Sequence, residues 1–142
     1  GTRAGHLDPG AVLWLVEELG NTESVRTLIN KESGLKGVSG LSPDMRQLLA
    51  SKDPQAAFAI AMFVDRLVLD VGRAAAAMQG AETLVFTGGI GENAKSVTDA
   101  ALARLGWLGA TCRIIKTDEE SIIARSVQAL LDRSSQVPLP KT

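Results

Sequence analysis

The pattern of apolar and polar positions along the chain predicts many helices and two short strands. Apolar spacing and capping residues indicate helices over residues 9–19, 22–31, 54–78, 94–105 and beyond 117, with a short helix beginning near Ser42. Asp8-Pro9 and Asp53-Pro54 are typical helix starts, because aspartate caps a first turn and proline suits the first helical position. Gly20 and Gly106 are the expected helix stops, and residues 34–42 are expected to form a glycine-containing loop.

Residues 54–78 are predicted to form the central helix of the chain. Their nearly continuous apolar sequence indicates a helix that is buried on most sides and packed on a sheet. Its charges can pair along the helix, Arg66 with Asp70 and Asp70 with Arg73. In the last helix, Thr117 and Glu120 match a capping box. Five apolar side chains of that helix are expected to point inward: Ile122, Ile123, Val127, Leu130 and Leu131.

A strand followed by glycines and a helix is the clearest local indication of function. Leu84, Val85 and Phe86 form a short apolar run typical of a buried strand, and residues 88, 89 and 91 are glycines. Backbone N–H groups can approach a phosphate or another part of a nucleotide there, at the start of a helix. Many such turns hold two glycines for packing alone, and this one is neither a Walker A loop nor a complete dinucleotide fingerprint. A second short strand is expected over residues 112–116.

Composition narrows the class of protein. The chain has 142 residues, enough for one domain with a core, and 45% hydrophobic and 22% charged residues are ordinary for a globular protein. A net charge of −1 without basic blocks does not suggest nucleic acid or an anionic membrane as a partner. A single cysteine, Cys112, permits no internal disulfide, which fits a reducing cytoplasm. We expect Cys112 to be buried and inert and the only histidine, His6, to be a loop residue rather than a base.

Four separated segments, in order and at similar spacing, resemble the C-terminal domain of the acetate kinase family, including its propionate-specific relatives. They are residues 1–10 (GTRAGHLDPG), 32–46 (ESGLKGVSG running into SPDMR), 85–93 (VFTGGIGEN) and 117–120 (TDEE). The resemblance implies an α/β, ribonuclease-H-like lobe from the superfamily of actin, sugar kinases and chaperone ATPases, here as a helix-rich fragment. It further implies reversible, Mg²⁺-dependent phosphorylation of acetate by ATP, giving acetyl phosphate and ADP, in a cytoplasmic homodimer with ATP held between two lobes.

The same resemblance implies roles for individual residues. Arg3 matches the arginine that stabilises the transition state, a role that suits a fixed cation beside the moving phosphoryl group. Glu119 matches a glutamate associated with Mg²⁺, although an acidic residue in a first helical turn also simply complements the helix dipole. The residues that match ATP-binding positions are Asp44, Met45, Arg46, Gly88, Gly89, Ile90, Gly91, Glu92 and Asn93.

The resemblance covers residues 1–133, and residues 134–142 are expected to form a mobile tail. The family's remaining active-site parts belong to an N-terminal lobe upstream of Gly1, so the isolated chain is predicted to be inactive. The connection between Leu108 and Thr117 is shorter than is usual in the family. Two alternatives stay open: a lobe of a propionate or butyrate kinase, and a non-catalytic module for nucleotide binding or dimerisation.

Overall fold

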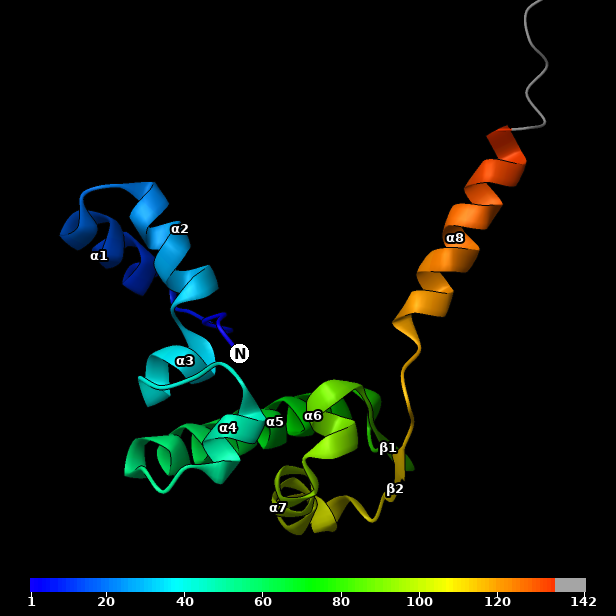
Figure 1. Ribbon diagram of the computed structural model, residues 1–142. Helices are drawn as coiled ribbons and strands as arrows, with labels where there is room; N and C mark the ends of the chain where they lie inside the picture. The colour runs from blue at the N-terminus through cyan, green and yellow to red at the C-terminus, as the bar shows by residue number, and fades with distance from the viewer. Residues whose placement is uncertain (135–142) are drawn as a thin grey trace, which may run out of the picture.

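The computed structural model describes residues 1–134 as a helical body from which one long helix projects (Figure 1). Along the chain the elements are α1 (Pro9–Leu19), α2 (Thr22–Lys31), α3 (Gly34–Ser39), α4 (Met45–Ala50), α5 (Pro54–Met78), β1 (Thr83–Phe86), α6 (Gly88–Asn93), α7 (Lys95–Leu105), the 3₁₀ turn η1 (Gly106–Leu108), β2 (Thr111–Ile114) and α8 (Glu119–Ser134). Within this part of the chain, no helix is both long and apolar enough to cross a membrane.

Helix α5 is the centre of the core, and its predicted bounds are confirmed. The expected burial on most sides is wrong, because other elements cover only one side of the helix and leave Phe58 59% and Met78 65% exposed. Asp53 caps it by accepting a hydrogen bond from the N–H of Gln55 at 2.8 Å, and Pro54 occupies the first turn. Helices α3, α4 and α7 all pack against α5. The buried apolar residues that they contribute join those of α5 in one cluster: Leu35, Met45, Leu48, Ala56, Ala59, Val64, Val97, Ala101 and Leu105.

Asp70 and Asp65 of α5 form two kinds of ion pair, one within the helix and one to another helix. Asp70 accepts a hydrogen bond from Arg73 at 2.9 Å, as predicted. Among the described residues, the other basic side chain near this carboxylate is that of His6, with Nε2 at 3.7 Å, rather than the expected Arg66. Asp65 accepts a hydrogen bond from Arg104 of α7 at 2.8 Å. The Asp65–Arg104 pair links separate helices and adds a half-exposed polar contact to the apolar packing of α7 on α5.

The sheet is small and parallel, and its strands β1 and β2 correspond to the two short strands predicted from the sequence. β1 pairs with β2, with Thr83 opposite Thr111 and Phe86 opposite Ile114. Phe86 is buried in the core cluster and Leu84 packs against it, so the sheet meets the core through these side chains. Every residue of β2 is exposed. The expectation that Cys112 is buried is therefore wrong, because β2 lies at an uncovered edge within residues 1–134.

The predicted loop over residues 34–42 is confirmed only for residues 40–42, because residues 34–39 form α3. Leu35 is only 5% exposed and packs into the core beside α5. Gly40 ends the helix in the left-handed conformation, and its N–H donates a hydrogen bond to the backbone carbonyl of Lys36 at 2.8 Å. Tertiary burial therefore outweighs the low helix propensity of the two glycines in this segment.

The predicted helix over residues 94–105 is confirmed as α7, which begins one residue later, and Gly106 follows its last residue as the C-cap. Ala94, with φ −101° and ψ 69°, separates α7 from the glycine segment, which is itself the short helix α6. Gly106 has right-handed rather than left-handed geometry, so the chain continues into η1 and the left-handed residue is Gly109, with φ 63°.

Two expectations about the last helix are also wrong. Its cap is Asp118 rather than Thr117, because Asp118 accepts hydrogen bonds from the N–H and hydroxyl of Ser121 at 3.1 Å and 2.6 Å. The five apolar side chains expected to point inward are each about half exposed or more, since α8 leaves the body of the chain (Figure 1). The expected tail lies, apart from Ser134 at the end of α8, outside the described residues.

The core around α5 can be tested with two neighbouring leucines of α4. Leu48 is 1% exposed and Leu49 is 39% exposed. We expect Leu48→Ala to lower the free energy of unfolding by about 2–5 kcal/mol, because it removes buried methyl groups and leaves a cavity. Leu49→Ala is the matched control and should cost much less. Urea denaturation measures both, and equal losses would contradict the placement of α4.

Candidate functional site

The N-terminal segment that carries Arg3 is held in place by backbone hydrogen bonds. Ala4 donates to the carbonyl of Ile29 at 2.8 Å, and Ser33 donates to the carbonyl of Thr2 at 3.0 Å. A Cβ on Gly34 would lie 2.8 Å from the carbonyl oxygen of Arg3, and Gly34 also has φ +61°. Glycine is therefore required at position 34, and its absence of a side chain lets the Arg3 backbone lie directly against α3.

Arg3 lines a cavity of about 390 Å³ between this segment, α3 and α5. Leu35, Ala59 and Phe63 form part of its apolar lining, and Arg66 adds a second cation. Arg3 itself is exposed. A cation fixed through its backbone at the edge of a partly apolar cavity can attract an anionic group and orient it.

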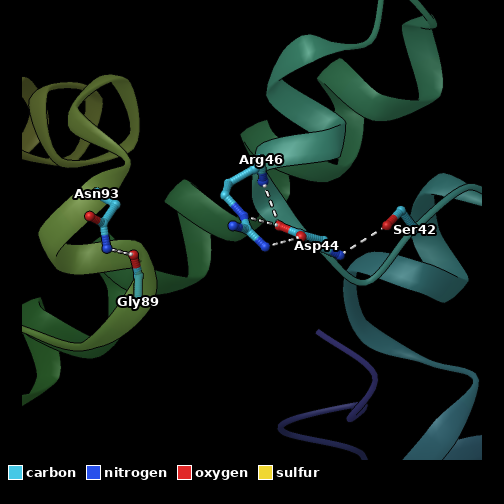
Figure 2. Close-up of polar contacts among 5 residues, drawn as sticks. All are labelled: Ser42, Asp44, Arg46, Gly89 and Asn93. Carbon is cyan, nitrogen blue, oxygen red and sulfur yellow. Dashed lines mark hydrogen bonds and ion pairs between the residues drawn. The ribbon is translucent and has the colours of Figure 1, made fainter.

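Asp44 and Arg46 form an ion pair at the start of α4 (Figure 2). The Asp44 carboxylate accepts from Nη2 of Arg46 at 2.7 Å, from its Nε at 3.2 Å and from its backbone N–H at 2.9 Å. The side-chain hydrogen bond from Arg46 is the main cause that lowers the pKa of Asp44, and the same contact raises the pKa of Arg46. Met45 between them is 3% exposed in the core, so any contact of Met45 with a ligand must come from its backbone.

The Asp44 segment and the Arg3 segment meet through Pro43. A Cβ on Gly1 would lie 2.5 Å from the carbonyl oxygen of Pro43, the residue before Asp44. The hydroxyl of Ser42 accepts a hydrogen bond from the N–H of Asp44 at 3.0 Å (Figure 2). The start of α4 is thus fixed both by its own turn and by the N-terminal segment.

The three glycines of α6 are glycines for different reasons. Gly88 has φ +72°, which favours glycine. At Gly91 a Cβ would lie 3.2 Å from the backbone of Phe86, so the helix approaches the strand closely there. Gly89 has no positive φ, and a Cβ added to it would meet no atom within 4 Å. The carbonyl of Gly89 accepts from Nδ2 of Asn93 at 2.9 Å (Figure 2). Packing alone therefore explains Gly91 but not Gly89.

Glu92 connects α6 to the segment that leads into α8. Its Oε1 atom accepts three hydrogen bonds, from the N–H of Gly88 at 2.9 Å and from the N–H and hydroxyl of Thr117 at 2.8 Å each. These bonds, those of Thr117 foremost, hold the pKa of Glu92 below its ordinary value. This use of Thr117 could not be predicted from the sequence, because a contact between residues 25 positions apart leaves no local signal.

The predicted metal residue, Glu119, is the first residue of α8. Its neighbour Asp118 is already bonded to Ser121 through both carboxylate oxygens. Among the described residues, no three histidine, cysteine or acidic side chains gather as they do in an all-protein metal site.

The structure thus brings together some of the predicted site residues. Glu92 links residues 88–93 directly to the segment before Glu119, and Pro43 links the Arg3 segment to Asp44. The two groups lie on different elements around α5: the first follows β1, and the second lies beside α3 and α4 (Figure 1). A strand, a short glycine-rich helix and a crossover back to a parallel strand define a helix-rich α/β unit with a candidate anion site.

Comparison with known proteins identifies the class more closely. The model of the Acetokinase family matches residues 1–131. The chain is 44% identical over 156 residues to the acetate kinase of Rhodopseudomonas palustris (strain TIE-1), covering 93% of this chain and 39% of that protein. It is 47% identical over 110 residues to the acetate kinase of Rickettsia akari, covering 77% of this chain and 29% of that protein. The chain therefore belongs to the Acetokinase family, and it spans less than half the length of these relatives.

Solved structures agree with this assignment. The acetate kinase of Porphyromonas gingivalis matches with a TM-score of 0.81 and 32% identity, over 92% of this chain and 40% of that one. A propionate kinase from Francisella tularensis matches with a TM-score of 0.76 and 30% identity, over 84% of this chain and 37% of that one. The α/β fold expected from the sequence, a helix-rich part of the kinase fold, is confirmed.

The hydrogen bonds to Glu92 predict how its carboxyl titrates. A lowered pKa in the folded state means that these bonds stabilise the fold fully above the unfolded pKa, and that this contribution is lost as the pH falls through the folded value. Thr117→Val removes the hydroxyl donor but keeps the N–H, so we expect the pKa of Glu92 to rise part of the way towards its ordinary value. NMR titration of the side-chain carboxyl carbon measures the change. Thr111→Val, at an exposed threonine of β2, is the control and should leave that pKa unchanged.

Proposed function

We propose that this chain is the C-terminal, nucleotide-binding lobe of an enzyme that transfers a phosphoryl group reversibly from ATP to acetate. The observation that carries the proposal is the match of the Acetokinase family to residues 1–131, together with 44% identity to an acetate kinase over 93% of the chain. In this proposal residues 1–133 form the lobe, and acetate, acetyl phosphate, ATP and ADP are its substrates and products.

The glycines of α6 support a nucleotide site after β1. The open space around Gly89 leaves its backbone accessible, whereas a side chain at this position would cover it. We assign Gly88, Gly89, Ile90, Gly91 and Asn93 to contact with ATP, because bare backbone can approach phosphate oxygens closely. Glu92 belongs to the same segment, and the bonds to its Oε1 atom suit a supporting role better than a direct contact.

Asp44, Met45 and Arg46 are proposed to contact the adenosine end of ATP. An aspartate can accept hydrogen bonds from ribose hydroxyls, and the stem of an arginine can lie along a base. In the structure Arg46 folds back onto Asp44, so its side chain would have to share or exchange that pairing when the nucleotide binds. Met45 would contribute only backbone, since its side chain is buried.

Arg3 is proposed to stabilise the transition state of phosphoryl transfer. Its backbone is fixed against α2 and α3, while its guanidinium is exposed beside a cavity. A fixed cation suits the charge that spreads over the equatorial oxygens of the moving phosphoryl group. Glu119 would help hold Mg²⁺, which neutralises phosphate charge when it is bound with ATP.

The remaining parts of the site would come from an N-terminal lobe of the same enzyme. The chain spans 39% of the Rhodopseudomonas palustris relative, and the apolar side chains of α8 are uncovered within the described residues. Phe58, Met62 and Leu69 form a further exposed apolar stripe along α5, which supports a homodimer contact on this lobe. A cytoplasmic location fits a kinase that uses ATP and acetate.

Two other functions have specific support. The similarity to a propionate kinase structure favours propionate, or butyrate, as an alternative acceptor, since the pocket that measures chain length is expected largely in the other lobe. A non-catalytic module for nucleotide binding or dimerisation would keep the glycines of α6 but would have no need of Arg3.

Arg3 separates catalysis from binding alone. In the full-length protein that contains this chain, Arg3→Ala should lower kcat by about 10³-fold or more with a smaller change in the KM for ATP, because the guanidinium acts chiefly in the transition state. Arg26→Ala is the matched control, since Arg26 is exposed and its recorded ion pair is with Glu23 of its own helix. A kcat within about twofold of wild type for Arg3→Ala would refute the catalytic role.

The acceptor and the need for the second lobe can be tested in one assay. Acyl-hydroxamate formation with Mg-ATP is compared for acetate, propionate and butyrate, using the full-length protein and the 142-residue chain, each with its intact mass verified. We expect the full-length protein to prefer acetate and the 142-residue chain to give no product. Turnover by the chain alone would contradict the two-lobe proposal, and a preference for propionate would change the acceptor.

A further inference from the structure

The structure contains one carboxylate oxygen on which two separate functional segments depend. Oε1 of Glu92 accepts from Gly88 at the start of α6, and it accepts twice from Thr117, two residues before Glu119. Glu92 and Gly88 are both partly buried. The parallel pairing of β1 with β2 and the hydrogen bond from the N–H of Ile115 to the carbonyl of Phe86 at 2.9 Å bring the two segments close together. Beyond the end of this ladder, Glu92 connects α6 to the residues directly before α8.

We propose that Glu92 is a positioning residue that holds the glycine segment of α6 and the start of α8 in one fixed arrangement for phosphoryl transfer. This inference rests on the proposed function. Residues 88–91 and Asn93 would contact the nucleotide phosphates, and Glu119 would help to hold Mg²⁺ when it is bound with ATP. Their relative position then sets how well the metal and the nucleotide are bound together.

The hydrogen bonds that the Glu92 carboxylate accepts support a positioning role rather than direct contact with ATP. The Oε1 atom of Glu92 already accepts three hydrogen bonds, which fix the direction of the carboxylate. The negative charge of this carboxylate would also be repelled by ATP phosphates at contact distance. The negative charge of the Glu92 carboxylate strengthens its hydrogen bonds to Gly88 and Thr117, because hydrogen bonds to an ionised acceptor are stronger than those to a neutral one. Glu92 therefore secures backbone groups that a neutral side chain would hold less firmly.

The test uses the full-length protein with Glu92→Ala, Glu92→Gln, Thr117→Val and the double variant Glu92→Ala/Thr117→Val. Glu82→Ala is the matched control, since Glu82 is an exposed glutamate just before β1. Hydrogen exchange of the amides of Gly88 and Thr117 reports on the connection itself. The KM values for ATP and Mg²⁺ and the kcat report on its effect on the reaction.

We expect Glu92→Ala to speed exchange at both amides and to raise the KM for ATP and Mg²⁺ together by about tenfold or more, as loss of an orienting partner commonly does. Glu92→Gln should recover part of both effects. Because both residues act through the same bonds, the double variant should be no worse than Glu92→Ala alone.

Three outcomes would overturn the proposal. The first is a change at only one of the two amides, and the second is a multiplicative loss in the double variant. The third is faster exchange at both amides with unchanged KM and kcat, which would make Glu92 only a structural contact. An inactive wild-type protein would instead count against the proposed function, and the dissociation constant of Mg-ADP would then replace the KM in deciding the role of Glu92.

Discussion

The burial of one side of α5 is the constraint on which the other elements depend. The side that carries Ala56, Ala59 and Val64 is apolar and must be covered by other elements, whereas Phe58, Met62 and Leu69 stay exposed. α3, α4 and α7 cover it, and most of the candidate site residues lie at or beside the ends of these helices. The Arg3 segment lies on α3, Asp44 caps α4, and α6 immediately precedes α7. The geometry of the site is therefore a consequence of how short helices cover a long one.

The polar contacts around the site belong to two classes. Most are local, such as the cap of Asp44 or the bond from Asn93 to Gly89, and each stabilises a single turn. The bonds from Thr117 to Glu92 join segments 25 residues apart. Local contacts set the shape of each segment, whereas a contact of the second class decides where one segment lies relative to another. Loss of a local contact should therefore change the structure of one turn only. Loss of the long-range contact should change both the α6 segment and the segment before α8.

Much of the fold could be predicted from the sequence because helix ends carry local signals. Asp8, Asn21 and Asp53 cap helices at the predicted positions, and Gly20 ends the first one. Two of the failures come from tertiary contacts that leave no local signal. Burial of Leu35 makes a helix of a glycine-containing stretch, and a bond to Glu92 takes Thr117 away from the capping role that then falls to Asp118. Periodicity predicts that apolar side chains gather on α8, but it does not tell which surface covers them, and they are exposed in the described residues. The candidate site could be located by its motifs, whereas the bonds between its segments required coordinates.

The uncovered strands have a consequence for handling the protein. Within residues 1–134 each strand has one edge without a partner, and Val85, Ile114 and Ile115 expose apolar surface beside it. Such an edge is a template for strands of other molecules, and a parallel pair of two strands has little stability of its own. Produced alone at high concentration, the chain should therefore tend to associate through these edges. Solubility, rather than the integrity of the helical core, would then limit what can be measured on it.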